Sequence, residues 1–115
     1  MSKSDEYQKE LDKLTTIFAD VEPSKAQLVQ GLIQDAAFLL AENLTLREII
    51  DRTGMVKVHP QYPDIQKSTE AAKQYLKNVN SYSVVIKTLN GVLMKNTIEQ
   101  EDEFDRFMKE MQGDG

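Results

Sequence analysis

The sequence contains no cysteine and only one histidine among its 115 residues. The absence of cysteine excludes disulfide bonds and thiolate chemistry, and it fits a reducing compartment. The sequence also lacks a nucleophile–base pair, a phosphate-binding glycine loop and the ligand spacing of a calcium loop. The single histidine, His59, stands beside a proline and is expected to be an exposed loop residue. We therefore expect a protein that is not an enzyme and that uses no cofactor and no metal.

Long apolar runs are also missing. Hydrophobic residues make up 40% of the chain and charged residues 29%. No stretch approaches the length of a membrane span, and the first residues lack the apolar segment of a signal peptide. The length suits one domain or less, with a thin core. We expect an intracellular protein that does not contact a membrane.

The three prolines divide the chain into helical segments. A short helix is predicted over residues 4–18, in an N-terminal region of residues 1–22, because apolar residues recur there at helical spacing. Pro23 suits the first turn of the next helix, predicted over 24–53, and Gly54 suits its C-terminal cap. The apolar side chains of this second helix spread over half of its circumference. Either several elements of the same chain or neighbouring subunits are needed to cover it.

Residues 55–66 are predicted to be the connection between two long helices. Met55-Val56-Lys57-Val58 alternates as an extended segment does, and Pro60 and Pro63 prevent the two helices from merging. A third helix is predicted over about 67–96, capped by Ser68 or Thr69. The connection lets the two long helices pack as an antiparallel hairpin, which forms the core region of residues 23–96.

The third helix carries the strongest pattern in the sequence, a seam of apolar residues spaced alternately by three and four. Such a seam lets one helix lie along another. It is longer than so short a chain needs for its own core, so it predicts self-association. Asn43 lies in a matching seam of the second helix, where it either fixes the register or is solvated near the helix end. The predicted oligomer interface comprises Leu32, Ala36, Leu39, Asn43, Tyr75, Val79, Tyr82, Ile86 and Leu89.

Residues 97–115 are predicted to be an acidic C-terminal region. Thr97 and Gln100 have the spacing of a capping box, which predicts a fresh helix over about 98–111. The apolar side chains of this helix share one face, which would dock a partner protein or fold back onto the core. They are Phe104, Phe107, Met108 and Met111.

The net charge of −5 is unevenly distributed along the chain. Residues 52–96 carry seven basic and two acidic side chains, whereas residues 1–51 and 97–115 are each acidic. This pattern is either the ordinary variation of solvated helix faces or a basic element that binds a polyanion. In the second case, several copies would pool lysines that contact DNA phosphates without reading the sequence. These lysines are Lys57, Lys67, Lys73, Lys77, Lys87 and Lys95.

A series of short motifs follows one another between about Phe18 and Lys95. They are Leu32-Ile33, Ala36-Ala37-Phe38, Leu46, Ile49-Ile50, Gly54, Val56-Lys57-Val58, Lys67-Ser68, Tyr75, Tyr82 and Ile86-Lys87-Thr88-Leu89. This order resembles the small terminase subunit family of tailed double-stranded DNA bacteriophages. The resemblance covers about two thirds of the chain, and Thr69 stands where a proline is expected.

The resemblance implies a non-catalytic DNA-packaging adaptor in the cytoplasm of a bacterial host. Such proteins form rings, bind phage or prophage DNA and recruit or regulate the large terminase subunit, which holds the ATPase and nuclease. The fold expected is all-α, a long antiparallel helical hairpin with a short helix at each end. The alternative is a dimeric helical scaffold that binds only protein.

Overall fold

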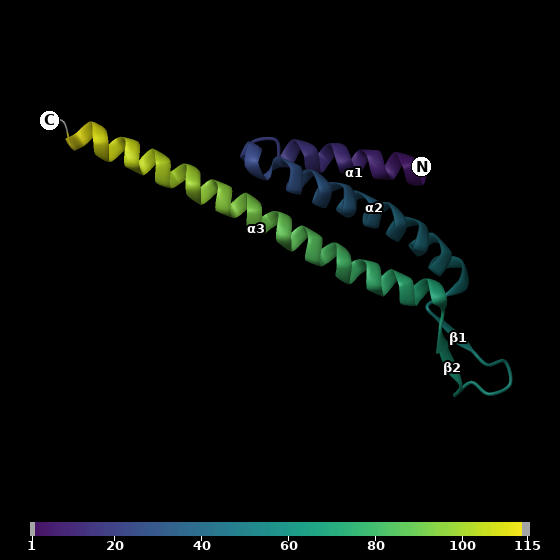
Figure 1. Ribbon diagram of the computed structural model, residues 1–115. Coiled ribbons are helices and arrows are strands. Elements are labelled where there is room, and N and C mark those ends of the chain that lie inside the picture. The colour runs from purple at the N-terminus through teal and green to yellow at the C-terminus, as the bar shows by residue number, and fades with distance from the viewer. Residues whose placement is uncertain (1, 114–115) are drawn as a thin grey trace.

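The computed structural model describes the backbone of residues 2–113 and the side chains of residues 2–95, 98 and 100–111. Over this range the chain is mostly helical and strongly elongated, with extents of 86 × 30 × 18 Å. Three helices and one small antiparallel sheet make up the described part. Their order is α1 (Lys3–Ile17), α2 (Pro23–Thr53), β1 (Val56–Val58), β2 (Gln66–Ser68) and α3 (Glu70–Gly113). Both α1 and α3 lie alongside α2 (Figure 1), and α1 also approaches α3, because the Tyr82 hydroxyl lies 3.5 Å from the Glu10 carboxylate.

The helix α1 lies within one residue of the predicted range 4–18. It begins at Lys3 because Ser2 and Asp5 form a capping box, in which the Asp5 backbone N–H donates to Ser2 Oγ at 3.1 Å. The helix runs antiparallel to α2, and Lys3 pairs with Glu42 at 3.0 Å. Leu14 and Phe18 are buried near the turn into α2. Packing against α2 supplies the stability that a helix of this length lacks in isolation.

The helix α2 begins and ends where its proline and glycine predict. Pro23 occupies the first turn, and the Gly54 N–H donates to the Ile50 carbonyl oxygen at the other end. Gly54 has a φ of +80°, a conformation that favours glycine. Both α1 and α3 pack against α2, so elements of the same chain cover much of its broad apolar surface. Ile33 and Ala36 are fully enclosed there.

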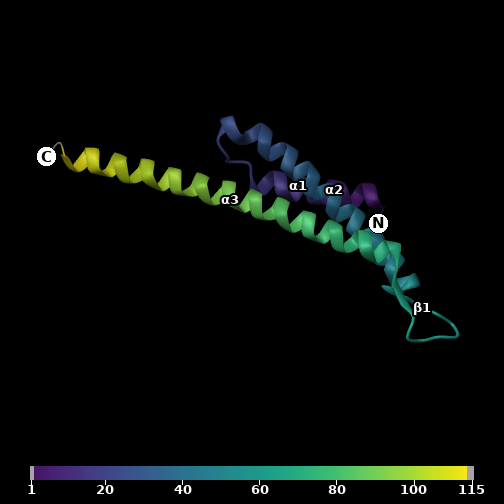
Figure 2. The same cartoon turned by 60° about the horizontal axis from the view of Figure 1, so that its bottom comes forward.

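A β-hairpin joins α2 to α3. The extended conformation predicted for Val56–Val58 is confirmed, but its pairing with Gln66–Ser68 was not predicted. The strands are antiparallel, and Lys57 lies directly opposite Lys67. Because Gln66–Ser68 is a strand, α3 begins at Glu70, three residues later than the predicted start at 67. The hairpin projects from one end of the molecule (Figure 2).

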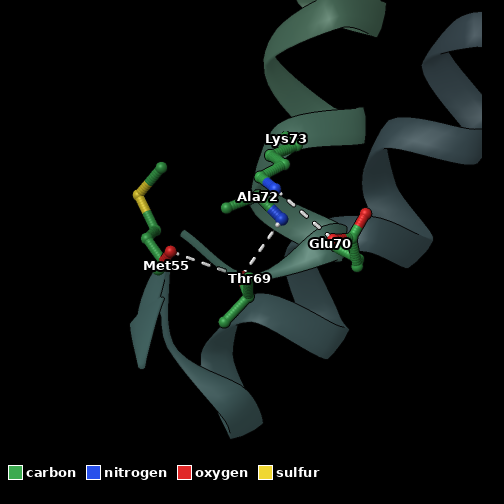
Figure 3. Close-up of polar contacts among 5 residues, drawn as sticks. All are labelled: Met55, Thr69, Glu70, Ala72 and Lys73. Carbon is green, nitrogen blue, oxygen red and sulfur yellow. Dashed lines mark hydrogen bonds and ion pairs between the residues drawn. The ribbon is translucent and has the colours of Figure 1, made fainter. Parts of the chain in front are cut away.

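Thr69 links the base of this hairpin to the start of α3. Its hydroxyl accepts from the Ala72 N–H at 3.3 Å, which confirms the predicted capping by Thr69. The same hydroxyl has two acceptors, the Gly54 carbonyl oxygen at 3.0 Å and that of Met55 at 3.3 Å. Figure 3 shows Thr69 between Met55 and the first turn of α3. Thr69 therefore closes the hairpin and caps the helix with one side chain.

We expect Thr69→Ala to lower the free energy of unfolding by about 1 kcal/mol, because it leaves the helix start without its cap. Thr69→Ser is the matched control, since it keeps the hydroxyl and should retain most of the stability. Urea unfolding followed by circular dichroism measures both variants. Equal losses for alanine and serine would show that the hydroxyl does not carry this stability.

The helix α3 is continuous from Glu70 to Gly113, so the prediction of a separate helix over 98–111 is wrong. The residues around Thr97 include no proline, and threonine is tolerated inside a helix that already supplies its backbone hydrogen bonds. A capping role for the Thr97 side chain lies outside the described side chains. The resulting helix has 44 residues and extends well beyond the turn between α1 and α2 (Figure 1).

The core is a thin layer between the three helices. Leu89 of α3 packs there with residues from α1, the following turn and α2. Tyr82 lies at its edge, and its hydroxyl is 3.5 Å from the buried carboxylate of Glu10. Burial raises the pKa of the Tyr82 phenol, and the charge of Glu10 and its hydrogen bond raise it further.

The pKa of Tyr82 is higher in the folded state than in the unfolded state, so the contribution of this residue to the free energy of unfolding changes at alkaline pH. The contribution is fully present below the pKa of the unfolded state, about 10, and is lost as pH rises through the folded value. We therefore expect Tyr82→Phe to lose less stability than the wild type between about pH 9 and pH 12. Tyr62→Phe, at an exposed tyrosine, is the control. Urea midpoints across this pH range measure the effect, and identical pH curves for Tyr82→Phe and wild type would contradict it.

Candidate nucleic-acid and assembly surfaces

Four of the predicted DNA-binding lysines form one exposed surface, the α3 lysine face, which consists of Lys73, Lys77, Lys87 and Lys95. At 100° per residue they fall within one side of α3, opposite the side that holds the buried Leu89. Lys73 pairs with Glu70 at 3.4 Å, as Figure 3 shows. Within the described part of the chain, the other three lysines form no ion pair, so their charges face solvent.

The remaining two predicted lysines, Lys57 and Lys67, lie apart from this face on the β-hairpin. Cross-strand partners project from the same face of a hairpin, so two positive charges lie side by side. Like charges in this position weaken a hairpin unless a negative group compensates them. The two lysines line a surface cavity of about 410 Å³ together with Val58, His59, Pro60 and Ile65.

His59 is exposed, as its loop position predicts, but it also organises the hairpin loop. Its Nδ1 atom accepts from the backbone N–H groups of Gln61, at 3.1 Å, and Tyr62, at 3.2 Å. The imidazole and the Tyr62 ring lie 5.1 Å apart. Sequence reasoning missed this structural role, because a histidine followed by proline carries no specific turn signature.

Three of the nine residues predicted to form the oligomer interface are buried within the chain and offer almost no surface to a second copy: Ala36, Asn43 and Leu89. Leu32, Tyr82 and Ile86 pack against the same core but are only half-buried, so their place in an interface stays a prediction. The other three predicted interface residues, Leu39, Tyr75 and Val79, are half-buried. Helical spacing indicates that a face needs cover, but it does not say whether the same chain or a second copy provides it.

Asn43 is an unusual member of this internal surface. It is buried in α2, and its Oδ1 atom has no hydrogen-bond partner among the described residues. A buried amide that lacks some of its hydrogen-bond partners lowers the stability of the fold. It can also make the packing more specific, because alternative packings that bury the amide among apolar groups are even less stable. The solvated position that the sequence left open for Asn43 is therefore wrong.

The predicted docking residues are exposed on the free end of α3, which we define as residues 100–111. Phe104, Phe107, Met108 and Met111 all face solvent, so the alternative in which they fold back onto the core is wrong. Further large apolar side chains are exposed elsewhere on α2 and α3, among them Leu28, Phe38, Leu76, Val84, Met94 and Ile98. Exposed apolar surface on this scale is typical of proteins that bind other proteins.

Metal-binding clusters and membrane-spanning helices are both absent from the described residues. Within them, no three His, Asp or Glu side chains gather into a group that could hold a metal ion. Likewise, no described helix has both the length and the apolar character needed to cross a bilayer.

Comparisons of this chain with protein-family models, with curated proteins and with solved structures find no match.

Proposed function

We propose that this protein is a DNA-packaging adaptor of the small terminase subunit type. It has no catalytic activity, assembles from several copies, binds double-stranded DNA and recruits or regulates a large ATPase/nuclease subunit. The observation that carries the proposal is the α3 lysine face, which is exposed along a straight helix and faces away from the core. The resemblance of residues 18–95 to small terminase subunits supplies the packaging context.

The dimensions of the α3 lysine face suit a DNA duplex. At 1.5 Å per residue, Lys73 and Lys95 lie about 33 Å apart along the helix axis. This length is close to one turn of B-DNA, roughly 34 Å. Lysines distributed over this length contact phosphates and carry no sequence information of their own. The expected binding is therefore sensitive to salt and tolerant of sequence.

Assembly is needed because one copy binds DNA weakly. The chain has a net charge of −5, so only local pooling of lysines gives a strongly positive surface. Several copies acting on one duplex raise the affinity through effective concentration. The exposed apolar side chains on α2 and α3 support such assembly.

A salt titration tests the DNA-binding part of this proposal. Fluorescence anisotropy with a labelled duplex of arbitrary sequence should show binding at low salt, and the logarithm of the affinity should fall linearly with that of the salt concentration. A second duplex of unrelated sequence should give a similar slope. If neither duplex binds at low salt, the DNA role is wrong, and a helical protein–protein scaffold explains the exposed apolar surface better.

A further inference from the structure

Two unpartnered surfaces lie at opposite ends of this elongated protein. One is the free end of α3, and the other is the β-hairpin (Figures 1 and 2). Both expose apolar side chains, and the two ends carry charges of opposite sign. A single chain cannot bring them together, because α3 is one continuous helix and the molecule is 86 Å long.

The free end of α3 is an amphipathic surface with acidic edges. At 100° per residue, Phe104, Phe107, Met108 and Met111 cover a sector of about 100°. Glu101 and Asp105 border this sector on one side, and Glu103 and Glu110 border it on the other. The sector lies on the same side of α3 as Leu89, which packs inside the molecule, so it continues an established packing face. A surface that complements this sector is apolar at its centre and positively charged at its edges.

The hairpin surface has this character. Pro60 and Ile65 supply apolar surface, and Ile65 lies on the face of the hairpin that carries Lys57 and Lys67, because every second residue of a strand shares a face. Ile65 is exposed, although an apolar side chain near the tip of a hairpin gains nothing from facing water. A carboxylate from a partner would compensate the two adjacent lysines.

We propose that the free end of α3 in one copy docks on the hairpin of a second copy. Pairing of two free ends with each other is disfavoured, because it brings their acidic edges together. Docking on the hairpin buries apolar surface on both sides and places Glu101 or Asp105 near Lys57 and Lys67. The contact is head-to-tail, so copies add in one direction and form a ring or an open chain.

This inference deepens the assembly part of the proposed function and is independent of DNA. It reassigns Lys57 and Lys67 from DNA contact to protein contact. The α3 lysine face, which lies along the middle of the molecule, stays free for DNA. A failure of the DNA proposal would therefore leave the head-to-tail contact untouched.

Sedimentation velocity of the full chain without DNA tests the contact. We expect Lys57→Glu/Lys67→Glu and, separately, Phe104→Ser/Phe107→Ser to raise the dissociation constant of self-association by about 100-fold each. All four residues are exposed, so circular dichroism should show unchanged helix content. Lys9→Glu/Arg47→Glu changes the charge equally on exposed residues that belong to neither surface and should leave self-association unchanged.

Mixing the two disabled variants gives the decisive result. Each retains one intact end, so the mixture should form a one-to-one complex although neither variant associates alone. A second pair of changes, Glu101→Lys/Asp105→Lys, should restore self-association when combined with Lys57→Glu/Lys67→Glu in one chain. If the hairpin variant associates normally while the phenylalanine variant does not, the free ends pair with something else and the proposal is wrong. Normal association of both variants would overturn it equally.

Discussion

Replacing Leu89 by alanine is expected to lower the free energy of unfolding by about 2–5 kcal/mol. Leu89 is only 1% exposed and belongs to one core cluster with apolar residues of α1 and α2, so the substitution leaves a cavity that the thin core cannot close. The total stability of a small domain is about 5–15 kcal/mol, so this single change removes a large part of it. Urea unfolding followed by circular dichroism measures the loss.

Leu76→Ala is the matched control, because Leu76 lies on the same helix but is 53% exposed. We expect it to change stability by less than about 0.5 kcal/mol. The comparison also separates an internal role from an intermolecular one. If Leu89 formed the oligomer interface that the sequence predicts, its loss would depend on protein concentration. A loss that varies strongly with concentration, or equal losses for both variants, would contradict the internal role.

The second large effect is expected for DNA binding. Lys77→Glu, Lys87→Glu and Lys95→Glu, combined in one chain, should weaken binding to duplex DNA by about 100-fold or more at low salt. The same variant should show a shallower salt dependence, because fewer counterions are released for each copy bound. These three lysines are exposed and form no ion pair within the described residues, so the protein should remain folded.

A control with the same change in charge combines Lys9→Glu, Arg47→Glu and Arg52→Glu, at exposed residues of α1 and α2 that do not belong to the α3 lysine face. This control should lose much less affinity, through the general change in net charge alone. Anisotropy titrations at several salt concentrations compare the two variants. Similar losses for both would show that DNA senses overall charge rather than the α3 lysine face.

Local signals in the sequence predicted the helices well. Pro23 and Gly54 fix the two ends of α2, and Thr69 caps α3, because each acts on its own backbone or on that of close neighbours. The strand pairing was not predicted, since a three-residue segment such as Gln66–Ser68 carries too short a pattern to indicate its partner. The continuity of α3 through Thr97 was missed because a capping box resembles a helix start even where the helix continues.

The surfaces were harder to predict than the elements. The outward direction of Lys73, Lys77, Lys87 and Lys95 follows from helical spacing and is confirmed. The same spacing does not reveal that Ala36 and Leu89 are buried by other helices of the same chain, because their burial depends on how α1 and α2 fold back along α3. The apolar cavity beside Lys57 and Lys67 arises from strand register and loop shape, neither of which the sequence reveals.

The central claim is that several copies together hold one DNA duplex. Native mass spectrometry of the purified protein with a short duplex, at near-physiological salt, tests it most directly. We predict one discrete assembly of several copies bound to a single duplex, and the same assembly without DNA when the duplex is omitted. A monomer or dimer that leaves the duplex free would contradict the account.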